Sequence, residues 1–168
     1  MTQRFRLNTY SLQDFTLNVL NGNSLGIIIA LIPAALTSQL LTFFGQHPWV
    51  TTVTMMTNVA QSMLPIIAAF AVGAFLRLGT LESAAIALSS IVSGGVVHSN
   101  SNGLYTLAGS GAILNVMLVT YLSAGLVLLL QDKLGQLKLI FLPTIVLLIG
   151  GSIGLVTLPW MLTIQGFI

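Results

Sequence analysis

An uncharged polar segment divides this apolar chain: Ser93-Gly-Gly-Val-Val-His-Ser-Asn-Ser-Asn-Gly-Leu-Tyr-Thr-Leu-Ala-Gly-Ser-Gly111. Irregular backbone inside a bilayer is tolerated only where protein or a water-filled cavity covers it, because each unpaired backbone group costs several kcal/mol in hydrocarbon. If the segment lies inside the membrane, it is the best site candidate in the chain. If it lies outside, it is an ordinary loop.

The composition predicts an integral membrane protein. Of the 168 residues, 55% are hydrophobic and only 5% are charged, whereas soluble domains carry roughly 25% charged residues. The absence of cysteine excludes disulfides, thiolate metal sites and a cysteine nucleophile. The formal net charge of +2 rests on few side chains and does not indicate nucleic-acid binding.

The apolar segments predict an all-α, polytopic fold with a single membrane domain over residues 1–168. About 20 apolar residues cross the hydrocarbon core, and the expected spans are residues 25–44, 50–76, 83–97, 112–130 and 139–164. Before them, residues 1–22 form an interfacial segment. Its amphipathic helix over 7–22 starts at a capping sequence, Ser11-Leu-Gln-Asp14. The alternative for residues 1–22 is a soluble tail whose periodicity is accidental. Residues 25–164 form the transmembrane bundle.

The basic residues predict the orientation. With a cytoplasmic N-terminus, all five lie on the cytoplasmic side: Arg4, Arg6, Arg77, Lys133 and Lys138. An odd number of spans would give a following copy the opposite orientation, as in transporters with inverted repeats. The chain also stops at Gln165-Gly-Phe-Ile168, directly after a span. We therefore expect one half of an inverted-repeat transporter, or a small protein that assembles with copies of itself or with a partner half.

The polar segment has the pattern of a broken-helix, or re-entrant, binding site. A short helix would end at Gly94-Gly95 and another would begin after Gly109-Ser-Gly111. Free carbonyls at the first helix end and free N–H groups at the next helix start can meet a ligand. Uncharged hydroxyl, amide and imidazole groups suit a sugar or polyol. The candidate contacts in this segment are His98, Ser99, Asn100, Asn102 and Tyr105.

Three polar residues elsewhere complete the candidate substrate-binding set. Asn58 and Gln61 share a helical face, where interhelical hydrogen bonding is the usual role and substrate contact the alternative. Glu82 suits the first turn of a helix capped by Thr80, with Arg77 nearby as its partner; a substrate or proton-coupling carboxylate is the sharper alternative. The pair of glycines in Gly150-Gly-Ser-Ile-Gly154 is typical of close helix packing.

No catalytic apparatus is evident in the sequence. It contains no nucleophile triad, no P-loop and no metal-ligand spacing, so we predict a transport component that is not an enzyme and needs no cofactor or metal.

Three short segments resemble phosphotransferase-system enzyme IIC-like permeases: Leu20-Asn-Gly-Asn-Ser-Leu-Gly26-Ile-Ile-Ile-Ala-Leu-Ile-Pro33, Lys138-Leu-Ile-Phe-Leu-Pro143 and Leu158-Pro159. In that family, an amphipathic helix and a Leu-Asn-Gly turn precede the first span. The resemblance implies a homodimeric sugar permease, with phosphoryl transfer performed by separate soluble components. Family members are longer, so the chain resembles their N-terminal half. No site residue is carried over from the family.

The resulting hypothesis is a multi-pass permease subunit of the plasma membrane for a small polar solute, a sugar. Its expected partners are the solute, the lipid bilayer, a second copy or partner half, and soluble phosphotransferase components. The alternative is a non-transporting, dimeric assembly or regulatory module in which Asn58, Gln61 and the 150–154 glycines join helices.

Overall fold

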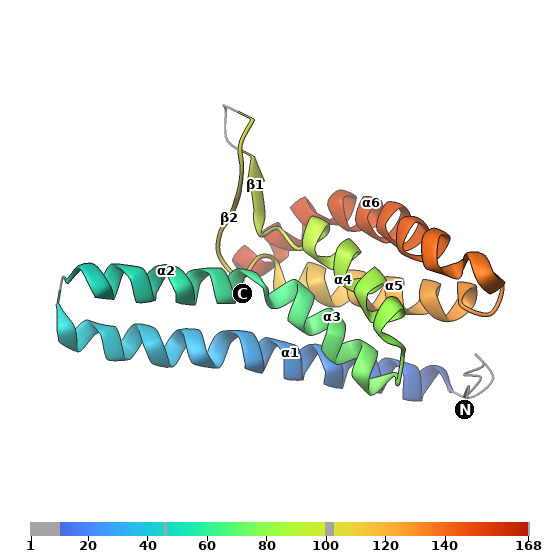
Figure 1. Cartoon of the computed structure of the whole chain (residues 1–168), viewed down its shortest axis with the longest axis horizontal. Helices are drawn as coiled ribbons and strands as arrows, with labels where there is room; N and C mark the ends of the chain where they lie inside the picture. The colour runs from blue at the N-terminus through green and yellow to red at the C-terminus, as the bar shows by residue number, and fades with distance from the viewer. Residues whose placement is uncertain (1–10, 46, 100–102, 168) are drawn as a thin grey trace.

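The computed structural model describes residues 11–45, 47–99 and 103–167, and helices dominate it (Figure 1). The long helices are α1 (Leu12–Leu41), α2 (Pro48–Ser62), α3 (Leu64–Phe75), α4 (Thr80–Ser93), α5 (Ile113–Leu130) and α6 (Lys138–Phe167). Two short 3-10 helices are η2 (Thr42–Phe44) and η3 (Gly135–Leu137), and one hairpin pairs β1 (Val97–Ser99) with β2 (Tyr105–Leu107). The all-α, polytopic class predicted from the sequence is confirmed.

Helix α1 begins at the predicted cap. The hydroxyl of Ser11 accepts a hydrogen bond from the backbone N–H of Asp14 at 3.1 Å, which pairs one of the free N–H groups of the first turn. The helix then continues to Leu41 without a break, so the expected turn at Leu20-Asn-Gly is wrong. Whether its first turns lie at the membrane interface remains a prediction.

Close packing against α3 explains why α1 stays helical through its glycines. A Cβ atom on Gly22 would lie 2.5 Å from Cα of Val72, and one on Gly26 would lie 2.4 Å from Cα of Ala68. Only glycine allows two backbones to approach so closely. The two glycines therefore fix the crossing of α1 and α3, although in most helices glycine lowers stability.

The expected span over residues 50–76 is bent rather than straight. Helices α2 and α3 meet at Met63 with an angle of 46° between them. Pro65 explains the break, because it has no N–H to donate to the carbonyl of Gln61 one turn earlier. An apolar span is thus broken at Met63, in addition to the interruption between α4 and α5 that the sequence predicts.

The expected helix over residues 83–97 begins and ends earlier than predicted. Helix α4 ends at Ser93, and the chain enters the hairpin, in which Val97 pairs with Leu107, and Ser99 with Tyr105. Gly111 closes the base of the hairpin with φ of 71°, and a Cβ there would lie 2.1 Å from the carbonyl oxygen of Gly94. Glycine is required at this position both by the left-handed backbone and by the close contact.

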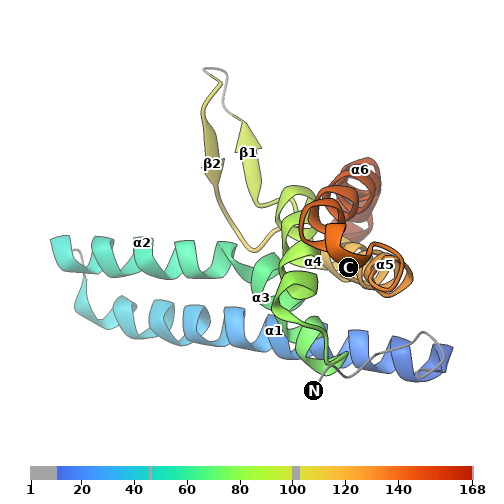
Figure 2. The ribbon, with the colours of Figure 1, turned by 45° about the vertical axis from the view of Figure 1, so that its right-hand side comes forward.

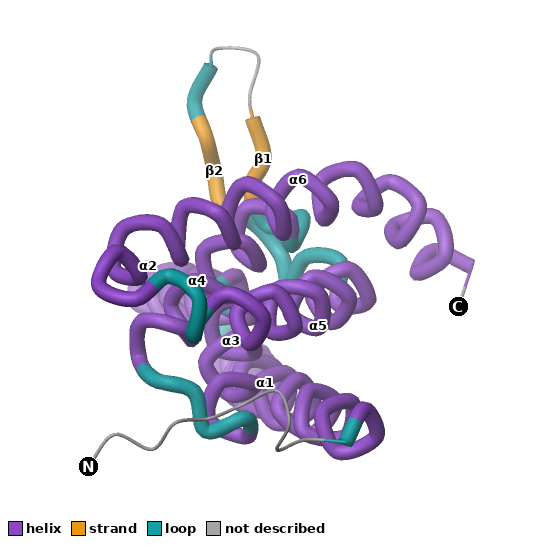
Figure 3. Tube along the Cα trace, turned by 90° about the vertical axis from the view of Figure 1, so that its right-hand side faces the viewer, coloured by secondary structure: helices purple, strands orange, loops and turns teal. Residues whose placement is uncertain are grey.

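The helices pack into a bundle from which a two-helix arm and the hairpin extend. In Figure 1 the start of α1, the α3–α4 turn and the α5–α6 turn lie at one end, here called the basic end, since Arg77, Lys133 and Lys138 belong to these turns. The second half of α1 and all of α2 form the arm at the other end. The hairpin stands away from the helices in Figures 2 and 3.

Within the part of the chain that the structure describes, three helical segments are long and apolar enough to cross a membrane: Leu12–Phe44, Ile113–Leu130 and Gly135–Gly166. The bent pair α2–α3 makes a fourth if it counts as one span. Helix α4 has only 14 residues, about 21 Å, which is shorter than a hydrocarbon core of about 30 Å. The expected number of five complete spans is therefore not established.

Candidate functional site

Helix α2 carries a polar stripe along an otherwise apolar surface. Thr51, Thr54, Asn58 and Gln61 recur at intervals of three and four residues, which places them on one face of the helix. Met56 lies on the opposite face, with 62% of its surface exposed. On the uncharged arm formed by α2 and the second half of α1, such a polar stripe requires water, a ligand or protein against it.

Part of this stripe faces α1 across a groove with a cavity volume of about 320 Å³, near the lower limit for small-molecule sites. The groove is lined by Leu31, Ala34, Ala35, Ser38, Leu41, Thr54, Thr57, Asn58 and Gln61. We call it the arm groove. The side chains facing it are uncharged throughout: three hydroxyls and two amides on walls of small and branched aliphatic residues.

The hydroxyls and the amides of the arm groove differ in their hydrogen bonding. Thr54 and Thr57 donate to the carbonyls of Val50 and Val53 one turn earlier, at 2.8 and 2.9 Å. Within the described residues, the side-chain amides of Asn58 and Gln61 contact no hydrogen-bonding partner. Each amide offers both donors and acceptors, so these two residues are the groups in the groove best able to bind a ligand.

A second groove lies on the other side of the stripe, where α2 faces the hairpin. Its cavity volume is about 590 Å³. It is lined by Gly45, Val50, Thr51, Thr54, Met55, Asn58, Val59 and Leu107. We call it the corner groove. Thr54 and Asn58 line both grooves, so the two spaces adjoin along α2.

Of the predicted contacts on residues 93–111, the described residues lie on the hairpin and do not line the arm groove. His98 and Ser99 are exposed on β1, and Tyr105 is 77% exposed on β2. Asn100 and Asn102 lie outside the described residues. Among the described residues of the hairpin, only Leu107 lines a groove that Asn58 also lines. The structure therefore brings Asn58 and Gln61 together but does not add the hairpin side chains to them.

The helix ends beside the hairpin are also less open than the broken-helix pattern predicts. The carbonyl of Gly94 accepts a hydrogen bond from the N–H of Ala112 at 2.7 Å. The amide of Asn115 donates to the carbonyl of Ser93 at 2.7 Å. These two carbonyls at the end of α4 are thus bonded within the protein instead of being free for a ligand.

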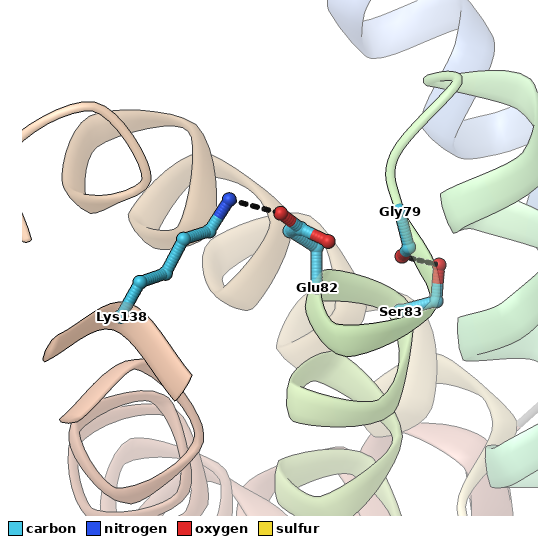
Figure 4. Close-up of polar contacts among 4 residues, drawn as sticks. All are labelled: Gly79, Glu82, Ser83 and Lys138. Carbon is cyan, nitrogen blue, oxygen red and sulfur yellow. Dashed lines mark hydrogen bonds and ion pairs between the residues drawn. The ribbon is translucent and has the colours of Figure 1, made fainter. Parts of the chain in front are cut away.

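Glu82 lies at the basic end, away from both grooves. It forms an ion pair and hydrogen bond with Lys138 at the start of α6, where its side chain is 10% exposed (Figure 4). The expected pairing with Arg77 and the expected cap at Thr80 are both wrong, since Gly79 is the N-cap residue. The ion pair joins two helices that are distant in sequence. It could therefore not be predicted from the residues around position 80 alone.

Buried polar pairs missed by the sequence analysis connect the helices of the bundle. Asn23 on α1 and Thr120 on α5 exchange hydrogen bonds at 2.9 and 3.1 Å. Ser89 on α4 and Ser123 on α5 lie 2.8 Å apart. Both pairs are fully buried, and their residues fall within apolar segments. In the sequence, an isolated amide or hydroxyl within an apolar segment is the feature from which such a hydrogen bond between helices could have been predicted.

The architecture and the uncharged grooves define a polytopic helical membrane protein with space for a small polar solute. Residues 17–168 match the family model described as "Phosphotransferase system, EIIC". The chain belongs to this family, the membrane permease component of the phosphotransferase system, and the predicted resemblance is confirmed. Searches of curated proteins and of solved structures found no match.

Proposed function

We propose that the chain binds an uncharged sugar or sugar alcohol in the arm groove, with the amides of Asn58 and Gln61 as the main polar contacts. The observation that carries this proposal is the pair of unpartnered amides in a solute-sized groove of a permease-family protein. An amide that finds no partner in the membrane is costly, whereas sugar hydroxyls can satisfy its donors and acceptors together.

The chemistry of the groove favours a substrate that carries no phosphate. Neither Lys nor Arg is among its lining residues, and phosphate binding ordinarily uses these cations or helix N-termini. Leu31 and Ala34 offer apolar surface for the C–H faces of a sugar ring. A sugar phosphorylated by soluble components would lose affinity for such a groove, so phosphorylation would favour its release.

We propose that the hairpin flanks the route by which the solute reaches the arm groove. With the basic end in the cytoplasm, the arm and its groove lie toward the outer side of the membrane. In this orientation His98, Ser99 and Tyr105 would flank the outer approach to the stripe on α2, through the corner groove that Leu107 borders. Glu82 is paired with Lys138 at the opposite end, and we propose that it stabilises the bundle.

Uptake measurements test the proposal. Cells producing the protein together with the soluble phosphotransferase components are assayed for uptake of labelled hexoses and hexitols. We expect Asn58→Leu and Gln61→Leu each to lower uptake several-fold, since one neutral hydrogen bond contributes about 1 kcal/mol. Gln39→Leu, an exposed amide of α1 that does not line the groove, is the matched control. Absence of uptake of any of these solutes by the unmodified protein would favour the non-transporting alternative.

A further inference from the structure

Another groove lies at the surface of the bundle where α1, α5 and α6 come together. Helix α5 lies between the other two in the view from the basic end (Figure 3). The groove has a cavity volume of about 330 Å³, and we call it the bundle groove. It is lined by Phe15, Tyr121, Leu122, Gly125, Leu126, Leu129, Ile149, Gly150 and Ile153, none of which lines the arm groove or the corner groove.

The lining of the bundle groove is apolar, in contrast to that of the arm groove. Among the described residues that line it, Tyr121 alone has a polar side-chain atom, and its hydroxyl oxygen lies 3.1 Å from that of Thr16. Thr16 donates its own hydrogen to the carbonyl of Leu12 at 2.8 Å, so Tyr121 is the donor in the contact between the two hydroxyls. The groove therefore presents no polar hydrogen in need of a partner, and it suits a hydrocarbon chain better than a polar solute.

Gly125 on α5 leaves space for such a chain. Glycine within a helix costs roughly 1 kcal/mol relative to alanine, and the close approach of another helix explains it at Gly22 and Gly26. At Gly125, a Cβ atom would meet only Cζ of Phe15 within 4 Å among the described residues outside its own helix, at an ordinary distance of 3.9 Å. Packing of the described residues thus does not require glycine here, whereas an occupant that approaches the backbone would.

The size and surroundings of the bundle groove favour a lipid chain over a helix as its occupant. Leu122 and Leu129 at the groove are 37% and 49% exposed on α5, a helix long and apolar enough to cross the membrane. Two turns of a helix about 10 Å wide would fill roughly 800 Å³, more than twice the volume of the groove. An extended acyl chain is much narrower than a helix.

Lys133 lies on the side of the groove from which a lipid headgroup would approach. Leu122, Leu129 and Lys133 follow one another at intervals of seven and four residues, which is one face of a helix. The turn after α5 keeps a helical hydrogen bond, from the N–H of Leu134 to the carbonyl of Leu130 at 3.3 Å. Lys133 is exposed and forms no ion pair with a described residue. A lysine at the end of a span reaches the headgroup level, where phosphate is the anion common to all phospholipids.

We propose that the bundle groove binds one acyl chain of a phospholipid from the leaflet at the basic end, with the lipid phosphate beside Lys133. The chain lies against Gly125, where a larger residue would exclude it. Because residues of three helices line the groove, the bound lipid holds the start of α1 against α5 and α6.

Native mass spectrometry of the full chain in a mild detergent tests this site, with phosphatidylglycerol and a diacylglycerol of the same acyl chains as probes. We expect the unmodified protein to retain phosphatidylglycerol, and Gly125→Leu, which fills the groove, to lower the lipid-bound fraction several-fold. Gly166→Leu is the matched control, since a Cβ there would meet no described atom within 4 Å. Lys133→Gln should lower the bound fraction of phosphatidylglycerol but not of the diacylglycerol, whereas Asp132→Asn in the same turn should lower neither.

Only variants that elute from size-exclusion chromatography like the unmodified protein are compared. If leucine at position 125 disturbs folding, Gly125→Ala takes its place, because its methyl group meets Phe15 at an ordinary contact distance. Equal lipid retention by the variants at positions 125 and 166 would show that lipid binds elsewhere on the surface. No retention by the unmodified protein would show that phospholipid is not the occupant. Either result would overturn the proposal. The assay requires no sugar, so its result is independent of the proposed function.

Discussion

The side-chain amide of Asn115 on α5 donates a hydrogen bond to the backbone carbonyl of Gly154 on α6 at 2.9 Å. It also donates to Ser93 at the end of α4, and its oxygen accepts from the hydroxyl of Thr157 at 2.7 Å. One buried side chain thus connects three helices beside the base of the hairpin. This arrangement uses the carbonyl of Ser93, which a broken-helix site would have offered to a ligand.

Replacing Asn115 by Leu should destabilise the bundle. The substitution leaves two carbonyls and one hydroxyl without their present partner in a buried place, at a cost of about 1–3 kcal/mol. Unfolding in detergent, followed by circular dichroism over a denaturant series, measures the change. Gln39→Leu on the exposed surface of α1 should leave the midpoint nearly unchanged, and an equal effect of both substitutions would contradict this role of Asn115.

Gly154→Ala should be strongly destabilising because of crowding between helices. The added Cβ would lie 2.4 Å from Cβ of Ser93 and 2.5 Å from Cγ2 of Val119. Overpacking of this kind costs about 1–3 kcal/mol. Gly166→Ala is the matched control, since a Cβ there would meet no atom within 4 Å. Thermal unfolding in detergent should separate the two variants; a tolerated alanine at position 154 would show that α6 is not packed here as described.

The Glu82–Lys138 pair should behave as a coupled unit. Removing one partner leaves a charge in a largely buried place, whereas removing both avoids that penalty. In a double-mutant cycle with Glu82→Gln and Lys138→Met, we therefore expect the double variant to be more stable than the sum of the single effects, by about 0.5–3 kcal/mol. The same cycle with Glu82→Gln and Arg77→Gln should be additive. Coupling to Arg77 instead of Lys138 would restore the local pairing expected from the sequence.

The hairpin should be open to water-soluble reagents. Ser99 and Tyr105 are exposed, whereas Ser89 is fully buried. We expect a membrane-impermeant thiol reagent, added from outside intact cells, to label Ser99→Cys and Tyr105→Cys but not Ser89→Cys. Labelling only after the membrane is opened would place the hairpin on the cytoplasmic side and reverse the proposed orientation.

Composition and hydropathy sufficed to predict the membrane class, the helical fold and most helix positions. The thickness of the bilayer sets the length of the uncharged segments, so these segments can be recognised from the local sequence alone. The close packing of Gly150 and Gly154 was also predicted. In the structure these glycines pack against Ser123 and Ser93 of the same chain, so their use is internal rather than between subunits.

What the sequence could not reveal depends on contacts between distant segments. The partner of Glu82 lies 56 residues away, and the satisfaction of the Ser93 carbonyl depends on a residue of α5. The bend at Met63 could have been inferred from Pro65. The polar face of Asn58 and Gln61 could have packed against several different surfaces. Its position opposite α1 could therefore not be predicted from the sequence.

We expect the arm groove to hold water and an uncharged sugar. The most direct measurement is the rate at which a membrane-impermeant thiol reagent modifies Ser38→Cys, a near-isosteric change in the groove, with and without a mixture of hexoses and hexitols. Because the thiolate is the reactive form, modification reports contact with water. Ser24→Cys, on α1 outside the groove, is the control. We predict that the sugars slow modification at position 38 and leave position 24 unaffected. No modification at position 38, or modification at one rate with and without sugars, would contradict the account.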